Sequence, residues 1–298
     1  MQTAVGYSLS GSTREEKLFF VHGDTATGKS TFIEAIKATF GEYAVTADFE
    51  AFLRRKEVGS IRNDIARLRG ARFVASIEVD QGKALAEGLV KMLTGGDTVS
   101  ARFLYNESFE FVPQFKLWLA ANHAPRVRDD DAAIWRRIIR VPFDHRIPEN
   151  EQNPEIKATL RNPEIAGPAI LAWAMKGCLT WQKEGLSIPD IIRESTAEYR
   201  QSQNPLAEFF EDICQFGPSA SVPVRDLRAA YEAWAKENGQ HFPLSLREFN
   251  KRLQAKGCNQ QTRRCLNEIG TERFVRTWVG ISLQDKPTFE EIEDEIPI

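Results

Sequence analysis

Apolar residues in the first half of the chain gather in short continuous runs, separated by stretches with helical spacing. Three such runs predict buried strands, at residues 17–21 (KLFFV), 73–77 (FVASI) and 115–121 (FKLWLAA). The stretches 30–40 and 84–93 repeat apolar residues at steps of three or four and predict helices. Strands that alternate with helices are typical of a parallel sheet covered by helices, so we expect an α/β core over residues 1–145.

A hairpin pattern lies between the second and third of these strands. Residues 98–105 and 109–112 have the character of its two arms, and the polar residues 106–108 form the turn. We therefore expect an antiparallel pair of strands here, in contrast to the parallel core.

Helices replace strands in the second half of the chain. Residues 146–203 predict a helical linker or lid segment, with helices over 169–183 and 189–202. Further along, a pair of basic and apolar strands ends the pattern at 273–283, after three helices expected over 205–215, 224–238 and 245–256. Three short helices followed by a hairpin are typical of a winged-helix domain, which we expect over 204–283.

The composition is that of an ordinary globular chain. Of its 298 residues, 42% are hydrophobic and 27% charged, and the length suits about two domains. No secretory leader follows Met1, and no apolar run approaches the roughly 20 residues of a membrane span. Four cysteines, at 178, 214, 258 and 265, form no CxxC pair and do not join histidines at metal-ligand spacing. We therefore expect a soluble protein with reduced thiols and no zinc site.

Charge is unevenly distributed along the chain. The net charge is −3, but residues 284–298 carry six acidic side chains and one basic one, and contribute −5. An acidic, proline-containing tail of this kind is typically disordered. The other 283 residues sum to +2, so the body of the protein is mildly basic and a nucleic-acid partner stays open.

The strongest chemical motif follows the first predicted strand. The sequence from Gly23 to Ser30 fits G-x-x-x-x-G-K-[ST], in which backbone N–H groups surround phosphates at the N-terminus of a helix. Lys29 then reaches the β- and γ-phosphates of the nucleotide, and Ser30 binds Mg²⁺. The motif does not distinguish kinases, GTPases and motors. The expected nucleotide-binding residues are Gly23, Asp24, Thr25, Ala26, Thr27, Gly28, Lys29, Ser30 and Thr31.

Polar residues also follow the ends of the other two predicted strands. A P-loop enzyme needs a carboxylate there to hold the hydration shell of Mg²⁺, and often a second one to polarise the attacking water. Glu78 and Asp80 are the available acids, and either could fill either role. Asn122 can hydrogen-bond the γ-phosphate or the water without adding negative charge. Solvated acids and a turn-forming asparagine are the alternatives.

Two arginines, Arg136 and Arg137, follow Trp135 and lie fourteen and fifteen residues beyond Asn122. An arginine on the surface of one subunit could enter the ATP site of its neighbour and stabilise the charge on the transferring phosphoryl group. Paired arginines are more often part of a solvated face, which is the alternative interpretation.

In order and residue type, these motifs resemble the helicase half of phage and plasmid primase-helicases, which are members of superfamily III. The resemblance covers residues 1–145 closely and rests on GYSLSG at 6–11, the 23–30 loop, LTGGD at 93–97, Ala101-Arg102, FEF at 109–111, NHAP at 122–125 and WRR at 135–137. It implies an AAA+-like P-loop ATPase fold, a hexameric ring and ATP-driven 3′→5′ translocation on DNA in the cytoplasm of a bacterial host. The C-terminal part is similar in kind to the winged-helix tail of the family.

The resemblance also implies roles for single residues. Asn122 would be the sensor and Arg136 the arginine finger that acts on the next subunit, with Arg137 as a second candidate. A full-length member of the family carries a primase domain upstream, whereas Gly23 follows only 22 residues here. We therefore expect a helicase-only protein, or the C-terminal piece of a longer one, that makes no primers itself and works with a primase domain or protein.

Two regions are candidates for contact with DNA. By the resemblance, the hairpin at 98–112 projects into the channel of the ring and contacts single-stranded DNA through Arg102, Tyr105 and Asn106. Between residues 245 and 280, eight basic residues stand against three acidic ones, which suits phosphate contact by a recognition helix and a wing. The candidates there are Arg247, Lys251, Arg263 and Arg264, and a solvated basic face or a subunit contact is the alternative.

The sequence therefore predicts an ATP-dependent replicative DNA helicase that forms a ring on single-stranded or forked DNA. A DNA-binding initiator or loader that uses ATP as a switch, without unwinding, would have much the same sequence. A small-molecule P-loop kinase is the more distant alternative, because it needs no basic C-terminal domain.

Overall fold

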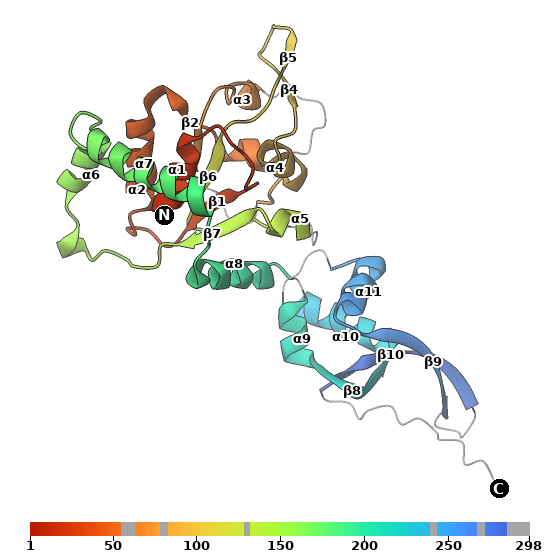
Figure 1. Cartoon of the computed structure of the whole chain (residues 1–298). Helices are drawn as coiled ribbons and strands as arrows, with labels where there is room; N and C mark the ends of the chain where they lie inside the picture. Colours follow the sequence, from red (N-terminus) through yellow and green to blue (C-terminus); the bar gives the residue numbers. More distant parts are fainter. Residues whose placement is uncertain are drawn as a thin grey trace. The chain divides into compact units, whose positions relative to one another are not determined.

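The computed structural model describes residues 1–54, 63–77, 83–127, 132–204, 206–238, 243–266 and 272–284. The chain, drawn in Figure 1, divides into two compact units, Met1–Gln203 and Asn204–Ile298. Each unit has its own hydrophobic interior. The first unit contains both the expected α/β core and the expected linker segment. The acidic tail, apart from Gln284, lies outside the described residues.

A five-stranded parallel sheet forms the centre of the first unit. Its strand order is β2-β3-β6-β1-β7, with β2 at Ala44–Thr46, β3 at Phe73–Ile77, β6 at Lys116–Ala121, β1 at Leu18–His22 and β7 at Ile138–Pro142. The expected α/β core is confirmed, and the three apolar runs are the three inner strands. The edge strands β2 and β7 have no counterpart among the expected strands, because one is three residues long and the other is interrupted by arginine and proline.

Side chains alternate between the two faces of the sheet, so each strand contributes to two separate cores. Phe20 and Leu119 belong to one core, whereas Phe19 and Trp118 stack in the other with ring centroids 4.3 Å apart. The first core is covered by η2 (Phe49–Phe52), α3 (Asn63–Ala66), α4 (Glu87–Thr94), α5 (Ala132–Trp135) and α8 (Asp190–Ser202). The second is covered by α1 (Gln2–Leu9), α2 (Lys29–Phe40) and α7 (Gly167–Glu184).

Shorter elements complete the first unit. They are η1 (Gly41–Tyr43), η3 (Glu149–Glu151) and α6 (Pro154–Arg161). Helix α4 begins three residues later than the apolar spacing predicts, because Ala84 and Leu85 form β-bridges to Arg126 and Leu53. Helix α6 occupies a segment whose prolines and polar residues gave no helical signal.

The expected hairpin is present between α4 and β6. Its strands β4 (Val99–Arg102) and β5 (Ser108–Phe111) pair antiparallel, and Arg102 lies opposite Ser108. The paired region is shorter than the sequence predicts, so the residues between them form a longer tip. In Figure 1 this hairpin extends away from the parallel sheet.

The second unit combines three helices with a three-stranded antiparallel sheet. Its elements are α9 (Ala207–Ile213), β8 (Cys214–Pro223), α10 (Val224–Glu237), α11 (Leu246–Ala255), β9 (Asn259–Leu266) and β10 (Glu272–Leu283), and the strand order is β8-β10-β9. Trp278 of β10 packs in the core with Phe209, Tyr231 and Phe249. The pair of strands expected over 273–283 is wrong: these residues form the single strand β10, which pairs with β8 on one side and β9 on the other. The strands β8 and β9 were not expected. Gly, Pro and Ser residues give β8 the composition of a loop, and pairing with β10 overrides that local preference.

The structure describes three of the four cysteines as free thiols. These are Cys178, Cys214 and Cys258, and burial raises the pKa of Cys214 to about 12. Within the described ranges, no helix combines the length and apolar character of a membrane span, and no cluster of His, Cys, Asp and Glu could hold a metal ion.

Helices α1 and α7 approach each other closely through two glycines. A Cβ atom on Gly6 would lie 2.1 Å from the backbone nitrogen of Cys178, and one on Gly177 would lie 2.1 Å from the carbonyl oxygen of Gln2. Both glycines are therefore required by backbone contact between the helices. This contact fixes the segment that leads from α1 to β1.

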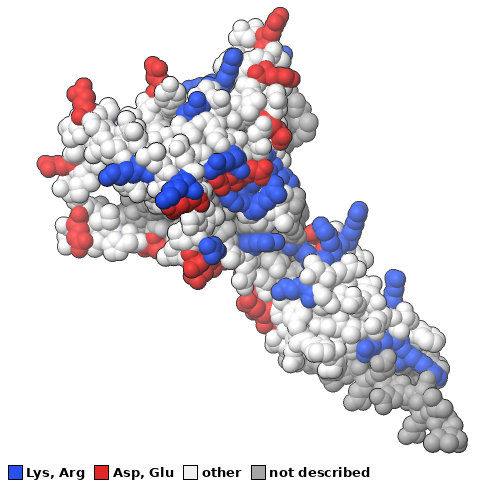
Figure 2. All heavy atoms as spheres, in the orientation of Figure 1, with Lys and Arg blue, Asp and Glu red and all other residues white. Residues whose placement is uncertain are grey.

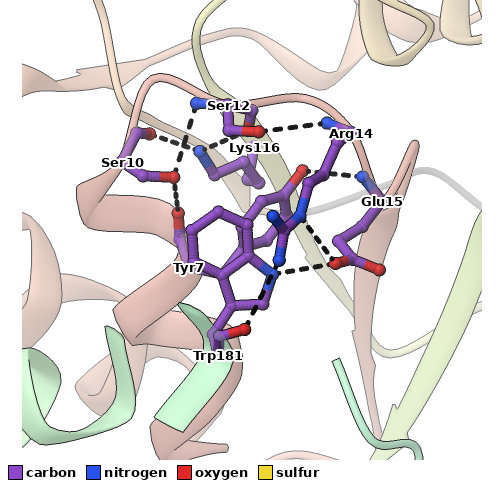
Figure 3. A network of polar contacts seen from close by, with 7 residues as sticks. All are labelled: Tyr7, Ser10, Ser12, Arg14, Glu15, Lys116 and Trp181. Carbon is purple, nitrogen blue, oxygen red and sulfur yellow. Dashed lines mark hydrogen bonds and ion pairs between the residues drawn. The ribbon is translucent and has the colours of Figure 1, made fainter. Parts of the chain in front are cut away.

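A buried lysine anchors the same segment to the sheet. Lys116, the first residue of β6, is 1% exposed, and its Nζ atom donates hydrogen bonds to the carbonyl oxygens of Ser10 and Ser12, the latter at 3.1 Å (Figure 3). The amine also lies 4.3 Å from the centroid of the Tyr7 ring. Burial, and to a smaller extent the charge of Arg72, lowers the pKa of Lys116 to about 7. A neutral amine keeps two hydrogens, which is enough for both carbonyls.

The following turn is bound to α7 by a second set of contacts in Figure 3. The Trp181 indole donates to Glu15 Oε1 at 2.9 Å, and the Arg14 guanidinium lies 4.2 Å from the centroid of the indole. The backbone N–H of Glu15 donates to the Tyr7 hydroxyl at 3.3 Å. The chain between α1 and β1 is therefore held on both sides.

The lowered pKa of Lys116 predicts a pH dependence of stability. Between about pH 7 and pH 10.5, the folded chain holds this amine neutral while the unfolded chain protonates it, so the free energy of unfolding should rise with pH. Relative to Lys116→Met, the natural chain should gain up to about 1.4 kcal/mol per pH unit in this range. Urea titrations at about pH 7, 8 and 9 measure the difference. Lys183→Met, on an exposed side chain, is the control. Parallel pH profiles for the natural chain and Lys116→Met would contradict the prediction.

Candidate functional site

The loop from Gly23 to Gly28 connects β1 to α2 and has an unusual backbone. Gly28, the N-cap of α2, adopts a left-handed conformation with φ 87°, and Ala26 does so with φ 61°. A Cβ atom on Gly23 would lie 2.1 Å from the carbonyl oxygen of Phe143, which follows β7. The loop is therefore folded tightly over the ends of β1 and β7. Behind it, the first N–H groups of α2 have no acceptor within the helix and are available to an anion.

Lys29 is held in the middle of this loop. Its side chain is 7% exposed, and Nζ donates to the carbonyl oxygens of Gly23 (2.7 Å) and Asp24 and to Thr27 Oγ1 (3.3 Å). Burial lowers the pKa of Lys29, and the nearby Asp24 opposes this effect. A buried ammonium of this kind gains from an anionic ligand.

A cavity of about 500 Å³, the loop cavity, brings several predicted residues together. It is lined by Thr25, Ala26, Thr27, Gly28, Lys29, Ser30 and Thr31 of the loop and α2, and by Ile77, Ala120, Ala121, Asn122, His123 and Lys157. Asn122 therefore lies at the same cavity as the loop, as parallel strands β1 and β6 require. Glu78 and Asp80 lie outside the described residues, but Ile77, the last residue of β3, is part of this wall.

A second cavity, the apolar cavity, adjoins the first. Its volume is about 700 Å³, and it shares Ala26, Gly28, Thr31 and Lys157 with the loop cavity. The other lining residues are Phe32, Ala35, Ile36, Ile147, Glu151, Gln152, Asn153, Pro154, Ile156, Leu160, Ala169, Ile170 and Trp173. It forms where α6 and the start of α7 face α2. No periodicity in the sequence could reveal such packing between distant segments.

Lys157 is a candidate that the sequence analysis missed. It lies on α6, lines both cavities, and its Nζ atom is 3.7 Å from Glu34 Oε2 on α2. Arg161, one turn further, reaches the same oxygen at 3.2 Å. The only signal in the sequence is a lysine in a polar, proline-rich segment, which is common in linkers.

The two arginines after α5 have different surroundings. The Arg136 side chain is 61% exposed, and its Nη2 atom lies 2.8 Å from Glu16 Oε2. Arg137 is 8% exposed, donates from Nη1 to the carbonyl oxygen of Ala133 at 2.8 Å, and also contacts Glu16 Oε2 at 3.0 Å. Arg136 is therefore the member of the pair that presents its charge to solvent.

Arg136 and the loop lie at opposite ends of two neighbouring strands. Strands β1 and β7 pair residue by residue, from Leu18 opposite Ile138 to His22 opposite Pro142. Arg136 precedes β7, whereas the loop follows β1. Five paired residues span roughly 16 Å at about 3.3 Å each. Arg136 therefore lies at the opposite end of these strands from the loop cavity of its own chain.

The predicted DNA-contacting residues of the hairpin are all exposed. Tyr105 is 96% exposed and has φ 63°, a left-handed backbone that turns the tip. Arg102 ends β4, and Asn106 closes the turn with its N–H bonded to the carbonyl oxygen of Phe103 at 3.1 Å. The exposed side chains of Phe103 and Leu104 add apolar surface to the tip.

The four candidates of the second unit lie on two elements. Arg247 and Lys251 are exposed on α11, one turn apart. Arg263 and Arg264 are half-buried neighbours on β9, so their side chains point to opposite faces of the strand. The face of this unit in Figure 2 carries several basic side chains and few acidic ones.

Two family models match separate parts of the chain. The model described as "Family of unknown function (DUF5906)" matches residues 21–137, which include the loop, the hairpin and the arginine pair. The model described as "Poxvirus D5 protein-like" matches residues 201–258, at the start of the second unit.

Two curated relatives are both named as putative helicases. The chain is 27% identical over 254 residues to "Putative helicase L207/L206" of Acanthamoeba polyphaga mimivirus, covering 79% of this chain and 26% of the relative. It is 25% identical over 291 residues to "Putative helicase 022R" of Frog virus 3 (isolate Goorha), covering 92% and 29%. The chain thus spans somewhat more than a quarter of the length of these relatives.

The apo structure of the NrS-1 C-terminal region in its A form has a similar fold. Its TM-score is 0.53 at 13% identity, with 94% of this chain and 70% of that chain covered. The chain is therefore similar over separate segments to the DUF5906 and Poxvirus D5-like families, and over most of its length to viral proteins named as putative helicases.

Proposed function

We propose that this chain is the ATPase motor of a replicative DNA helicase of a phage, plasmid or integrated mobile element, acting in the cytoplasm of a bacterial host. A hexameric ring of such subunits would hydrolyse ATP and move 3′→5′ along single-stranded DNA at a fork, with a primase domain or protein as its partner. The names of the two viral relatives support a helicase activity.

The observation that carries this proposal is the composition of the loop cavity. A glycine-rich loop, a buried lysine and the amide of Asn122 meet there at the carboxyl ends of parallel strands. In open α/β sheets, ligands bind outside the carboxyl ends of the strands. Lys29 would bind the β- and γ-phosphates, and Asn122 would orient the γ-phosphate or the attacking water.

Mg²⁺ would be held by Ser30 together with Glu78 and Asp80, and it would supply positive charge against the phosphates. Ser30 lines the loop cavity beside Lys29, which fits this role. The apolar cavity next to it suits the base and ribose of the nucleotide, because its walls are largely hydrophobic. Lys157, which lines both cavities, is a further candidate for contact with the phosphates.

The order of the strands and helices supports a more specific fold for each unit. Strand β6, which Asn122 follows directly, lies between β1 and β3, and this order supports an AAA+-like core. The three helices and antiparallel sheet of the second unit support a winged-helix domain. Arg247 and Lys251 on α11 and Arg263 and Arg264 on β9 would then contact phosphates of DNA.

The position of Arg136 supports a ring. Arg136 precedes β7, whereas the loop follows the neighbouring strand β1. Its guanidinium could therefore stabilise a transferring phosphoryl group only in a neighbouring subunit. ATP would then be bound between subunits.

The first experiment is steady-state ATP hydrolysis with and without single-stranded DNA, with the oligomeric state followed by light scattering. We expect strong stimulation in a particle of about six chains. Hydrolysis by a monomer that ignores DNA would favour a small-molecule kinase. Strand displacement on a forked duplex separates a helicase from an ATP-switched initiator or loader, which binds the fork without opening it.

Substitution of either charged residue of the ATP site should stop turnover in different ways. Lys29→Ala should abolish hydrolysis and weaken ATP binding. Arg136→Ala should leave ATP binding intact and lower kcat by about 10³-fold or more, as for other arginine fingers.

Mixing the two variants tests the trans arrangement. Rings that contain both chains have some interfaces with an intact Lys29 and an intact Arg136, so part of the activity should return. Unchanged turnover in Arg136→Ala alone would overturn the finger assignment.

The hairpin tip should contribute to DNA binding by stacking. Tyr105→Ala should weaken binding of an oligo(dT) strand by about fivefold to a hundredfold, because one stacked base is worth roughly 1–3 kcal/mol. Fluorescence anisotropy measures the change. Tyr43→Ala, at another exposed tyrosine, is the matched control. Equal affinity of the two variants would show that Tyr105 does not stack on DNA.

A further inference from the structure

One carboxylate serves both arginines that follow α5. Glu16 Oε2 lies 2.8 Å from Arg136 Nη2 and 3.0 Å from Arg137 Nη2. Glu16 lies in the turn before β1, so this contact joins segments 120 residues apart in the sequence. Neither the loop motif nor the arginine pair draws attention to Glu16 in the sequence.

The backbone around Glu16 is shaped for this contact. Glu16 adopts φ 53°, a left-handed conformation that residues with side chains rarely adopt, and its N–H donates to the carbonyl oxygen of Thr13 at 2.8 Å. Such strain persists where surrounding contacts enforce it and is frequent at functional sites. Next to it, Lys17 Nζ donates to the carbonyl oxygen of Arg136, and Leu18 N–H donates to that of Arg137 at 2.8 Å.

We propose that Glu16 is a positioning residue that orients Arg136 toward the ATP of the neighbouring subunit. This inference rests on the proposed function, in which Arg136 is the finger. Arg137 acts as the anchor: it is buried, and its bond to Ala133 and its ion pair fix the position of the Glu16 carboxylate. Arg136 then takes its direction from that fixed carboxylate.

The ion pair leaves Arg136 able to bind phosphate. A guanidinium has five N–H donors in a planar fork, and the contact with Glu16 engages Nη2. The side chain remains 61% exposed, so most of it stays accessible to a ligand. The carboxylate therefore restricts the rotamers of a long side chain without covering its charge, which reduces the entropy lost when the finger engages.

The contact also lies on a firmly held segment. The turn from Ser10 to Glu15 is bound to β6 through Lys116 and to α7 through Trp181 (Figure 3). Glu16 follows this turn directly. A rigid support is what a positioning residue needs, because a displacement of about 1 Å can cost a hundredfold in rate.

Glu16→Gln tests the proposal in the full chain. The amide keeps the shape but loses the charge, and we expect kcat for DNA-stimulated hydrolysis to fall about 10- to 100-fold with the KM for ATP unchanged. Glu16→Asp should recover part of the loss. Glu42→Gln, at an exposed glutamate of η1, is the control and should behave as the natural chain.

A double-mutant cycle separates positioning from a general structural role. Added to Arg136→Ala, Glu16→Gln should lower the residual single-turnover rate no further, because it acts through the missing arginine. An equal loss in both backgrounds would overturn the proposal. Faster turnover in Glu16→Gln would also overturn it, since Glu16 would then restrain the finger. If Arg136→Ala itself keeps its turnover, the proposed function fails at the finger; if only Glu16→Gln is silent, the failure is confined to Glu16.

Discussion

The in-register parallel pairing of β1 with both β6 and β7 is the constraint on which the arrangement of the first unit depends. It brings the 23–28 loop and Asn122 to the carboxyl ends of the strands and leaves Glu16 and the arginine pair at the amino ends. Because the strands are short and buried on both faces, neither end can shift without moving the other. In the proposed helicase, one subunit would therefore present its nucleotide site and its arginine finger at opposite ends of the strands, as a closed head-to-tail assembly requires.

The parts of the fold that were predictable are those with a strong local signal. The runs FVASI and FKLWLAA end within a residue of the observed strands, because a strand buried on both faces must be continuously apolar. β7 and β8 contain prolines or polar residues and exist because neighbouring strands pair with them. Local composition cannot carry that information.

At the candidate site, too, some residues have a local signal in the sequence and others do not. The loop and Asn122 were recognisable, because their chemistry is tied to residue type and to the ends of strands. The apolar cavity, Lys157 and Glu16 depend on contacts between distant segments, for which one sequence has no signal. Burial also separates Arg136 from Arg137, although they are neighbours of the same type. Glu78 and Asp80 stay predictions, since they lie outside the described residues.

Left-handed backbone at residues other than glycine lowers the stability of the folded chain at three positions. Within the described ranges it occurs at Glu16, which pairs with both arginines, at Ala26 in the 23–28 loop and at Tyr105 in the hairpin tip. Glycine would relieve a strain of roughly 1–2 kcal/mol at such a position. The easiest gains in thermal stability therefore coincide with the side chains on which movement along DNA would depend. A variant optimised for stability alone would therefore be expected to lose the proposed activity.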